Sequence, residues 1–505
     1  MDLKIGIAGL SPSWKIILEQ EGISYREIDC SLPIDPDEFS AIIIDDINAT
    51  TFDSNYLKNG GAVLFSSKSY AKIFNKKLYM KKKKVVADAN SIFSELGIID
   101  LVGRIGIVRD EELKCEDKGL NILSGKLGKG SFYIMPFDLD KEILNLSSCR
   151  RKFIANRNEL PSEVVAKVSK AKLRKTVTTI LSILLDIRKL PFIHKSYIPG
   201  NNGLFIFRID TDNCSKEDAE NLLKVCEKHS IRASWFVDTM NEQKLSDLYA
   251  NMKDQEIGLH CFRHLVFDNY SANFENIDTG MKNLQRSNIT VKGFAAPFGS
   301  WNTSLNEVLE KFDFTYSSEF VPSYDDLPFY IYTNNQYSNI LQIPIHPISL
   351  GRLRRSHFTK EEMIEYYINI INEKRKRNEP ILIYHHPHHK LLDVIDAVFG
   401  YVNKLGLANY TMNEYAEWWQ KRNQIKMDIS FEENELRMNI DDEDMTIINN
   451  KKVCNFKSRK RIDLSKLEFV PIKSLSKPLN INLTRKYHWR DTLYDYESWK
   501  GRRNR

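Results

Sequence analysis

The sequence predicts an α/β protein with more than one domain, in which an irregular (β/α) barrel is the largest part. The chain has 505 residues, which is longer than one ordinary core needs. Short apolar runs alternate with helical stretches over residues 3–67 and again over 200–422, and such alternation predicts parallel strands joined by helices. After residue 424 the pattern changes to short alternating runs without helices, which indicates a small β-rich region.

Four regions follow from these changes of pattern. They are an α/β domain with a parallel sheet over 1–150, a helical connector over 151–197, the barrel over 198–424 and the β-rich region over 425–505. The connector is expected because residues 160–189 read as one helix, with Ser162 and Glu163 after a proline as its start. A barrel of more than 200 residues is an ordinary length for a single domain.

The composition excludes several classes of protein. A hydrophobic content of 42% with 28% charged residues is typical of a water-soluble globular chain. The net charge of +6 comes from 73 basic and 67 acidic residues, so it does not indicate a nucleic-acid partner. The longest apolar run, 177–185, is about half a membrane span, so no transmembrane segment is expected.

The expected compartment is the cytoplasm. The opening "MDLKIGIAGLSPSW" reads as a first β-strand and lacks the features of a secretory signal. Seven scattered cysteines without a close C-x-x-C pair favour reduced thiols over a disulfide framework.

The first chemical feature is "FRIDTDN", an apolar strand that ends in Asp210 and Asp212. Carboxylates at the carboxyl end of a barrel strand lie on the face where barrel enzymes place their chemistry. Acidic pairs also cap helices or simply bind solvent, so the pair alone leaves its role open.

The second feature is "EIGLHCFRH", in which His260 and His264 follow a strand-like run. If this segment turns helically, both rings lie on one face and can share one ion; the alternative is a pair of satisfied histidines under a loop. Together with Asp212 they make three ligands and leave an open coordination position, as in catalytic metal sites. These ligand types favour Zn²⁺ or another first-row divalent ion, such as Co²⁺, Ni²⁺ or Fe²⁺.

The third feature is "YHHPHH", residues 384–389, at the end of the strand "PILI". Four histidines in five residues at the same face supply a candidate general acid. Others among them are structural.

In this order the motifs resemble those of the polysaccharide deacetylases, carbohydrate esterase family 4, over residues 200–422. Asp210 and Asp212 match the D-x-D motif, and His260 and His264 match H-S/T-x-x-H, with Cys261 in the hydroxyl position. The third motif, R-x-P-Y/F-G, is similar to "AAPFG", residues 295–299, and the last motif is similar to "YHHP". The barrel is therefore expected to be a deacetylase domain.

The resemblance implies a role for each matching residue. Asp212, His260 and His264 bind the metal, and Asp210 is the general base that activates water. His386 then protonates the departing amine, with His385 as the fallback, and the backbone N–H of Phe298 helps to hold the oxyanion. The substrate-binding residues expected around them are Pro297, Trp301, Tyr316 and His385.

The sequence departs from the family pattern in two places. The arginine of the third motif, which orients the catalytic aspartate, is Ala295 here. Either Arg208 or Arg263 substitutes for it, or activity is low. There is also no D-x-x-D-W motif; "FTYSSEF", residues 314–320, stands in its place.

The leading expectation is a metal-dependent hydrolase that removes an N-acetyl or similar acyl group from an amino sugar of a glycan or activated sugar precursor. One alternative is an inactive carbohydrate-binding homologue that lost turnover with the arginine. A glycosyltransferase that uses "DTD" to hold a metal is another, but it leaves the histidines unexplained. By analogy alone, the first domain is similar to flavodoxin-like or amidotransferase-like modules, with a structural or recognition role.

Overall fold

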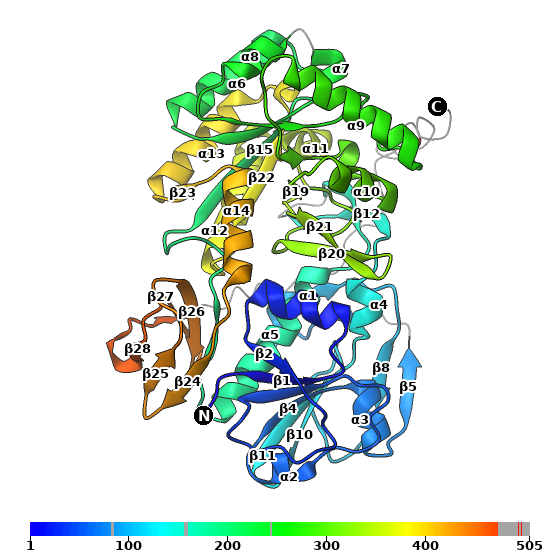
Figure 1. Cartoon of the computed structure of the whole chain (residues 1–505), viewed down its shortest axis with the longest axis vertical. Coiled ribbons are helices and arrows are strands. Elements are labelled where there is room, and N and C mark those ends of the chain that lie inside the picture. Colours follow the sequence, from blue (N-terminus) through cyan, green and yellow to red (C-terminus); the bar gives the residue numbers. More distant parts are fainter. Residues whose placement is uncertain (82–84, 156–159, 243–244, 473–492, 494–495, 497–505) are drawn as a thin grey trace. The chain divides into compact units, whose positions relative to one another are not determined.

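A computed structural model describes the whole chain except residues 82–84, 156–159, 243–244, 473–492, 494–495 and 497–505 (Figure 1). The chain is mixed α/β and divides into two compact units. The first unit gathers residues 1–145, 168–201 and the described part of 421–479, and the second gathers 146–167 and 202–420. Each unit has its own apolar core.

The first unit is built on a seven-stranded sheet. Its strands, in spatial order, are β2 (Tyr25–Glu27), β1 (Ile5–Ala8), β3 (Ala41–Ile44), β4 (Ala62–Ser66), β11 (Gly130–Met135), β10 (Ile122–Leu127) and β9 (Lys114–Asp117). The first five strands pair parallel to one another, whereas β10 pairs antiparallel with both β11 and β9. Strands β1, β3, β4 and β11 are buried along their whole length, as expected for a sheet covered on both faces.

Helices pack on this sheet. They are α1 (Pro12–Glu21), α2 (Ser54–Lys58), α3 (Ser67–Ile73), α4 (Leu139–Ile143) and α5 (Lys170–Ile187). Helix α5 contacts β3, β4 and β11, whereas α2 and α3 contact β4 and β11. Helix α1 begins where the sequence suggests, because Ser11 caps it and a proline occupies its first turn.

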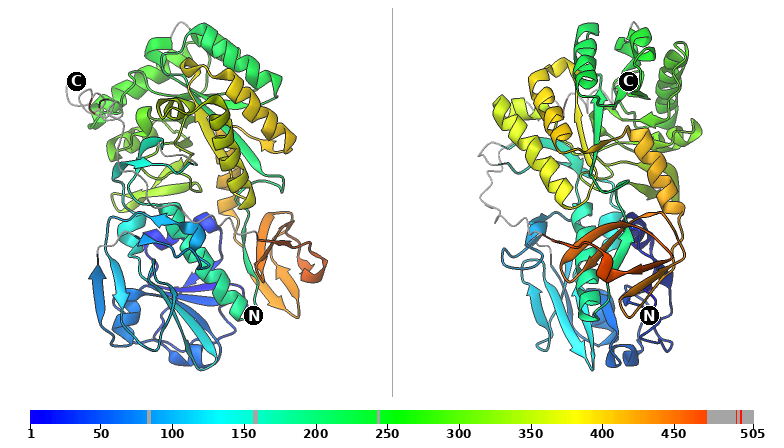
Figure 2. Two further views of the ribbon diagram at one scale, coloured as in Figure 1. Left: turned by 180° about the vertical axis from the view of Figure 1, so that it is seen from behind. Right: turned by 90° about the vertical axis from the view of Figure 1, so that its left-hand side faces the viewer.

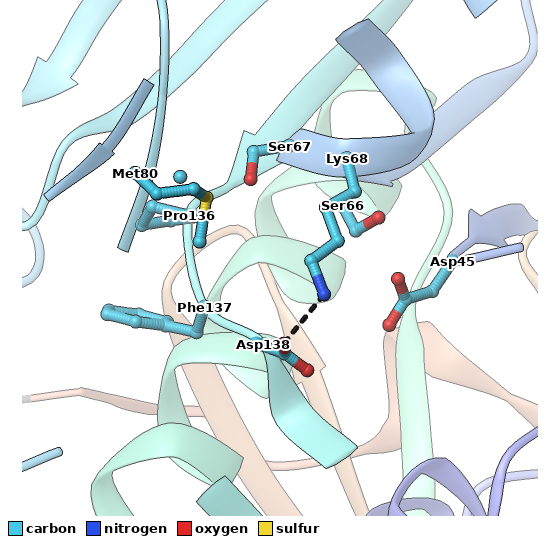
Figure 3. Close-up of a pocket in the computed structure, with 9 residues that line it drawn as sticks. Asp45, Ser66, Ser67, Lys68, Met80, Pro136, Phe137 and Asp138 are labelled. Atoms are coloured by element: carbon cyan, nitrogen blue, oxygen red, sulfur yellow. Dashed lines mark hydrogen bonds and ion pairs between the residues drawn. The ribbon is translucent and has the colours of Figure 1, made fainter. Parts of the chain in front are cut away.

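A small pocket lies at the carboxyl ends of β3, β4 and β11 (Figure 3). Asp45 follows β3 and accepts a hydrogen bond from Trp14 Nε1 at 2.8 Å. Across the pocket, Lys68 Nζ lies 2.6 Å from Asp138 Oδ2. Burial raises the pKa of Asp45 to about 6, although the bonds from Ser66 and Trp14 favour its charged form.

Short strands complete the first unit. They are β5 (Leu78–Lys81), β6 (Val85–Val86), β7 (Ile98–Ile99), β8 (Ile105–Val108), β14 (Phe192–Lys195), β24 (Ile429–Glu432), β25 (Glu435–Met438), β26 (Asp444–Asn449), β27 (Lys452–Lys457), β28 (Arg461–Asp463) and β29 (Val470–Pro471). Strand β14 pairs with β26, so the carboxyl-terminal strands join this unit through the end of the predicted connector. Most of the basic, aromatic tail lies outside the described residues.

The predicted connector helix is shorter than expected and is preceded by a strand. Residues Ser162–Ala166 form β13, which pairs antiparallel with β12 (Ser148–Lys152), and α5 begins only at Lys170. The helix prediction from residue 160 is therefore wrong. Val164 and Val165 are β-branched, and pairing with the preceding strand β12 outweighs the weak local helix start.

The second unit is a curled sheet with an open edge. In spatial order its strands are β20 (Phe329–Thr333), β21 (Gln336–Gln342), β19 (Tyr316–Ser317), β18 (Gly293–Phe294), β17 (Glu256–Leu259), β16 (Ala233–Val237), β15 (Leu204–Asp210) and β22 (Ile381–His385), with β23 (Ala408–Asn409) beside β15. All pairings are parallel except that of β20 with β21. A backbone bond from His346 N to Leu382 O, 2.9 Å long, crosses the open edge beside β22.

Helices surround this sheet. They are α6 (Lys216–Lys228), α7 (Thr239–Glu242), α8 (Ser246–Ala250), α9 (Tyr270–Gln285), α10 (Thr303–Lys311), α11 (Leu350–Arg355), α12 (Lys360–Lys376), α13 (Leu392–Lys404) and α14 (Met412–Gln424). Figure 2 shows α12 and α13 lying side by side, and α12 contacts β22. No helix in the described part of the chain has the length and hydropathy that crossing a membrane requires.

Strand β15 illustrates how this sheet orients its side chains. Phe205, Phe207 and Ile209 belong to the core between sheet and helices, and the Phe207 ring lies 4.9 Å from that of Phe399 in α13. Because side chains alternate along a strand, Arg208 and Asp210 point to the inside of the curl. The same strand thus anchors the core and presents charged groups to the interior.

Candidate active site

Three predicted ligand residues meet at the carboxyl ends of the parallel strands. Asp212 lies two residues after β15, His260 directly follows β17, and His264 lies in the loop that continues from it. Asp212 Oδ1 is 3.0 Å from His260 Nε2 and 3.2 Å from His264 Nε2, and the two ring nitrogens are 3.2 Å apart. Ligands with bonds of about 2.1 Å to one tetrahedral ion stand about 3.4 Å from each other, so the spacing suits a first-row ion.

The hydrogen bonding of His260 explains why a cation fits here. Its Nδ1 lies 2.6 Å from the carbonyl oxygen of Ala295, which can only accept, so Nδ1 carries the hydrogen. In the neutral ring the lone pair is then on Nε2, and it faces the Asp212 carboxylate. Asp212 Oδ1 is buried and has no donor among the described residues apart from the two histidine rings. Two facing acceptors need either a proton or a metal ion between them.

The charges in this cluster are strongly coupled. Burial alone would raise the pKa of Asp212, but the rings of His264, His386 and His260 hold it well below its ordinary value. Burial likewise opposes protonation of His264, yet Asp212 outweighs it and raises the pKa of His264 to about 9. The cluster therefore favours a carboxylate surrounded by positive charge, which is also what a divalent ion supplies.

The last histidine motif contributes one ring to the cluster. His386 Nε2 lies 3.5 Å from Asp212 Oδ2, whereas His385 Nε2 bonds the carbonyl oxygen of Lys390 at 3.0 Å. Burial lowers the pKa of His386 to about 4 and that of His385 to about 3. His386 is thus the ring that faces Asp212, and His385 supports the turn after β22.

The third motif forms the rim. Pro297 is buried, and Phe298 follows it with φ 58°, a left-handed conformation that costs an aromatic residue free energy. The Phe298 ring is 41% exposed and lies 5.0 Å from the ring of His264. Trp301 is buried, and its indole N–H has no partner among the described residues.

Tyr316 is not part of this group. It is fully buried, and its hydroxyl donates to Glu256 Oε1 at 2.5 Å. Glu256 is the first residue of β17, whereas His260 follows the other end of that strand. The structure therefore separates this predicted substrate residue from the cluster.

The sequence left the partner of Asp210 open, and the structure decides it. Arg208 donates from Nε to Asp210 Oδ1 at 2.6 Å and from Nη2 to Oδ2 at 2.7 Å. Arg263 is 40% exposed and has Glu275 as its ion-pair partner, 3.9 Å away. His346 bonds Asp325 and the hydroxyl of Tyr366, so it is structural.

Two further carboxyl groups lie near the cluster, and the sequence reasoning missed the first of them. Asp238 directly follows β16, is fully buried and contributes to the high pKa of His264. An acidic residue at a strand end was its signal in the sequence. Glu319 belongs to "FTYSSEF", where the sequence suggested it as a pocket residue together with Tyr316. It lies just after β19, and burial raises its pKa to about 7.

The part of the chain that carries Asp212, His260 and His264 is similar to known proteins. The family model named polysaccharide deacetylase matches residues 209–317. A comparison with curated proteins finds no match.

Similar solved structures include a Mycobacterium smegmatis protein assigned to the polysaccharide deacetylases (15% identity, TM-score 0.38, 47% of this chain and 96% of that one). A CE4 family pseudoenzyme from Bacillus anthracis matches with 13% identity and a TM-score of 0.33, over 43% of this chain and 66% of that one. A family 4 acetyl xylan esterase from Clostridium thermocellum, in complex with a cobalt ion, matches with 14% identity and a TM-score of 0.32, over 43% of this chain and 91% of that one. The segment that matches the polysaccharide deacetylase family, residues 209–317, carries the aspartate and both histidines of the cluster.

Proposed function

We propose that the protein is a metal-dependent deacetylase that removes an N-acetyl or similar acyl group from an amino sugar of a glycan or glycan precursor. The observation that supports this most is the facing pair of acceptors, Asp212 Oδ1 and His260 Nε2, with His264 Nε2 beside them. A structural zinc site would be closed by four ligands, and the described residues offer three. A bound divalent ion supplies a Lewis acid that lowers the pKa of water and polarises an acyl carbonyl.

The chain's own groups then divide the proton transfers. Asp210 takes a proton from the attacking water as the water oxygen bonds to the acyl carbon. His386 gives a proton to the amine nitrogen as the C–N bond breaks, so the products are a carboxylic acid and an amino sugar. Burial lowers the pKa of His386, so we propose that its ring takes this proton from solvent before the bond breaks and that Asp210 returns its own proton to solvent afterwards, which restores both groups. The backbone N–H of Phe298 is the proposed donor to the oxyanion.

Substrate contacts are proposed at the rim. The exposed ring of Phe298 offers an apolar surface for the face of a sugar, and Trp301 has an unused N–H for a hydroxyl or acyl oxygen. Pro297 shapes the turn that carries Phe298, and His385 supports His386. Zn²⁺ is the ion proposed, with Co²⁺, Ni²⁺ and Fe²⁺ as the other candidates.

For the other regions we propose more limited roles. The parallel strand order β2-β1-β3-β4 supports a flavodoxin-like arrangement of the first domain. Its role is proposed to be structural or in recognition. The strands β24–β29 are proposed to be an accessory β-rich region.

Acetate release from N-acetylated oligosaccharides of amino sugars, measured with each of the four metals, tests this function. We expect release by the native protein and at least about a 10³-fold loss in Asp210→Asn, because the general base is removed. Metal and glycan binding without acetate release would instead identify an inactive carbohydrate-binding homologue. A protein that binds no metal contradicts both.

A further inference from the structure

The interior of the barrel contains a buried ion pair that the family motif does not supply. Arg208 and Asp210 point inward from the same strand and are 1% and 3% exposed. The planar guanidinium meets both carboxylate oxygens, at 2.6 and 2.7 Å, in the two-bond geometry that fixes orientation as well as distance. A carboxylate held this way has lost its freedom to rotate.

The guanidinium is itself held from the other side. Arg208 Nη1 donates to the carbonyl oxygen of Ser318 at 2.7 Å and to its hydroxyl at 3.1 Å. The Ser318 hydroxyl donates in turn to the carbonyl oxygen of Ile343 at 2.8 Å, so the contact reaches the end of β21. The arginine thus connects β15 to the far side of the curled sheet.

Aromatic rings enclose the same group. The guanidinium carbon lies 5.4 Å from the ring centroid of Phe236, 5.8 Å from that of Phe320 and 5.6 Å from that of Tyr384. These rings exclude water and favour a delocalised cation by cation–π attraction. A lysine or neutral side chain cannot reproduce all of these contacts.

Neither the residue at the position of the motif arginine nor the other candidate arginine contacts Asp210 through its side chain in the hydrogen bonds described above. Ala295, which stands at the motif arginine, acts through its backbone, because its carbonyl oxygen accepts from His260 Nδ1. Arg263 lies at the surface. We propose that Arg208 is the positioning residue for Asp210 and that, with Ser318 as its anchor, it replaces the arginine missing from the third motif. This inference rests on the proposed function, in which Asp210 is the base.

The arrangement leaves Asp210 able to accept a proton. Each carboxylate oxygen has two lone pairs, and Arg208 uses one on each. The remaining lone pairs are then held in a fixed direction. A base fixed in this way raises kcat without contributing to substrate affinity.

Arg208→Lys is the first test, because it keeps the positive charge and removes the two-bond contact between the planar guanidinium and the carboxylate. We expect kcat to fall by about 10²-fold while KM changes by less than about threefold. In an Asp210→Asn background the same substitution should change the residual rate by less than about threefold, because the group that it positions is gone. Ser318→Ala should lower kcat by about three- to tenfold.

Arg232→Lys is the matched control. Arg232 also pairs with a carboxylate, that of Glu414, but it precedes β16 and so lies at the opposite end of the strands. We expect kcat within about twofold of the native value. If Arg208→Lys does not fold, Ser318→Ala against this control decides the question, and an unchanged kcat overturns the inference.

A readout that needs no turnover completes the test. Zn²⁺ affinity of Arg208→Lys, measured by titration calorimetry, should stay within about threefold of native, and its crystal structure should show the Asp210 carboxylate rotated. An unmoved carboxylate, a kcat within twofold of native, or an equal loss in the Asp210→Asn background would each overturn the proposal. If the native protein releases no acetate, the proposed function fails, and the position of Asp210 in Arg208→Lys still decides this inference.

Discussion

Carboxyl groups of this protein differ in protonation according to what surrounds them. In the barrel unit, Asp212 is part-buried and Glu319 is fully buried. Histidine rings hold the pKa of Asp212 well below its ordinary value, whereas burial raises the pKa of Glu319 to about 7. Asp45 in the first unit has a pKa of about 6 for the same reason as Glu319. Burial favours the neutral acid unless positive charge is close enough to outweigh it.

The proposed metal ligands give the first prediction at this scale. His264→Ala should lower Zn²⁺ affinity by at least about 10²-fold, because it removes one of three ligands. Titration calorimetry against a competing chelator measures this. His346→Gln is the control, since that ring is also buried beside a carboxylate but lies outside the cluster. Equal losses of affinity in the two variants would contradict the assignment.

Asp45 gives a prediction for the pH dependence of stability. Its folded pKa is about 6 against an ordinary 3.8, so the folded state binds the proton more tightly. The resulting stabilisation is complete below about pH 4 and is lost as pH rises through about 6. Asp45→Asn should therefore raise the free energy of unfolding by about 2 kcal/mol more at pH 8 than at pH 4.

Urea unfolding of this variant at both pH values measures the effect. Asp37→Asn is the control, because Asp37 is exposed in the same unit. The explanation by burial fails if the stability gain of Asp45→Asn is the same at both pH values.

At the scale of one element, β15 separates stability from chemistry by the alternation of its side chains. Phe207→Leu should lower the free energy of unfolding by about 1–3 kcal/mol, because it leaves space against Phe399. Zn²⁺ affinity should stay within about threefold of native, since this face points away from the ligands. Urea unfolding and calorimetry check the two parts, and a large loss of affinity would show that the two faces are coupled.

Elements also differ in how well their sequences predict them. Strands β15, β16, β17 and β22 are apolar runs that end in a charged or imidazole side chain, so both their existence and their chemistry could be predicted. Strand β13 was not predicted, because Ser162 and Glu163 after Pro161 were read as a helix start, whereas these residues pair with the preceding strand β12. Strand β20 was not predicted either, although its aromatic and β-branched residues and the turn of Asn334 and Asn335 before β21 are typical of a hairpin.

At the scale of the whole molecule, each of the two compact units has its own core, and one of them contains the proposed metal ligands Asp212, His260 and His264. Zn²⁺ at about 1,000 times its Kd should stabilise that unit by about 4 kcal/mol. Scanning calorimetry should show two transitions, with one moved upward by Zn²⁺ and the other unchanged. In His264→Ala the same Zn²⁺ concentration should stabilise that unit by only about 1.4 kcal/mol or less, because its Kd is at least about 10²-fold higher. Equal shifts of both transitions in the native protein would contradict the prediction.

The sequence by itself determined the α/β class, the resemblance of one segment to the polysaccharide deacetylases, and the proposal of a site made of Asp210, Asp212, His260, His264 and His386. These depend on residue type at strand ends and on short spacings, which are local properties of a chain. Only the tertiary structure decided between Arg208 and Arg263, between His385 and His386, and against Tyr316. Those choices depend on which side chains face each other across a curled sheet, and such distances are set by packing between segments up to about 170 residues apart.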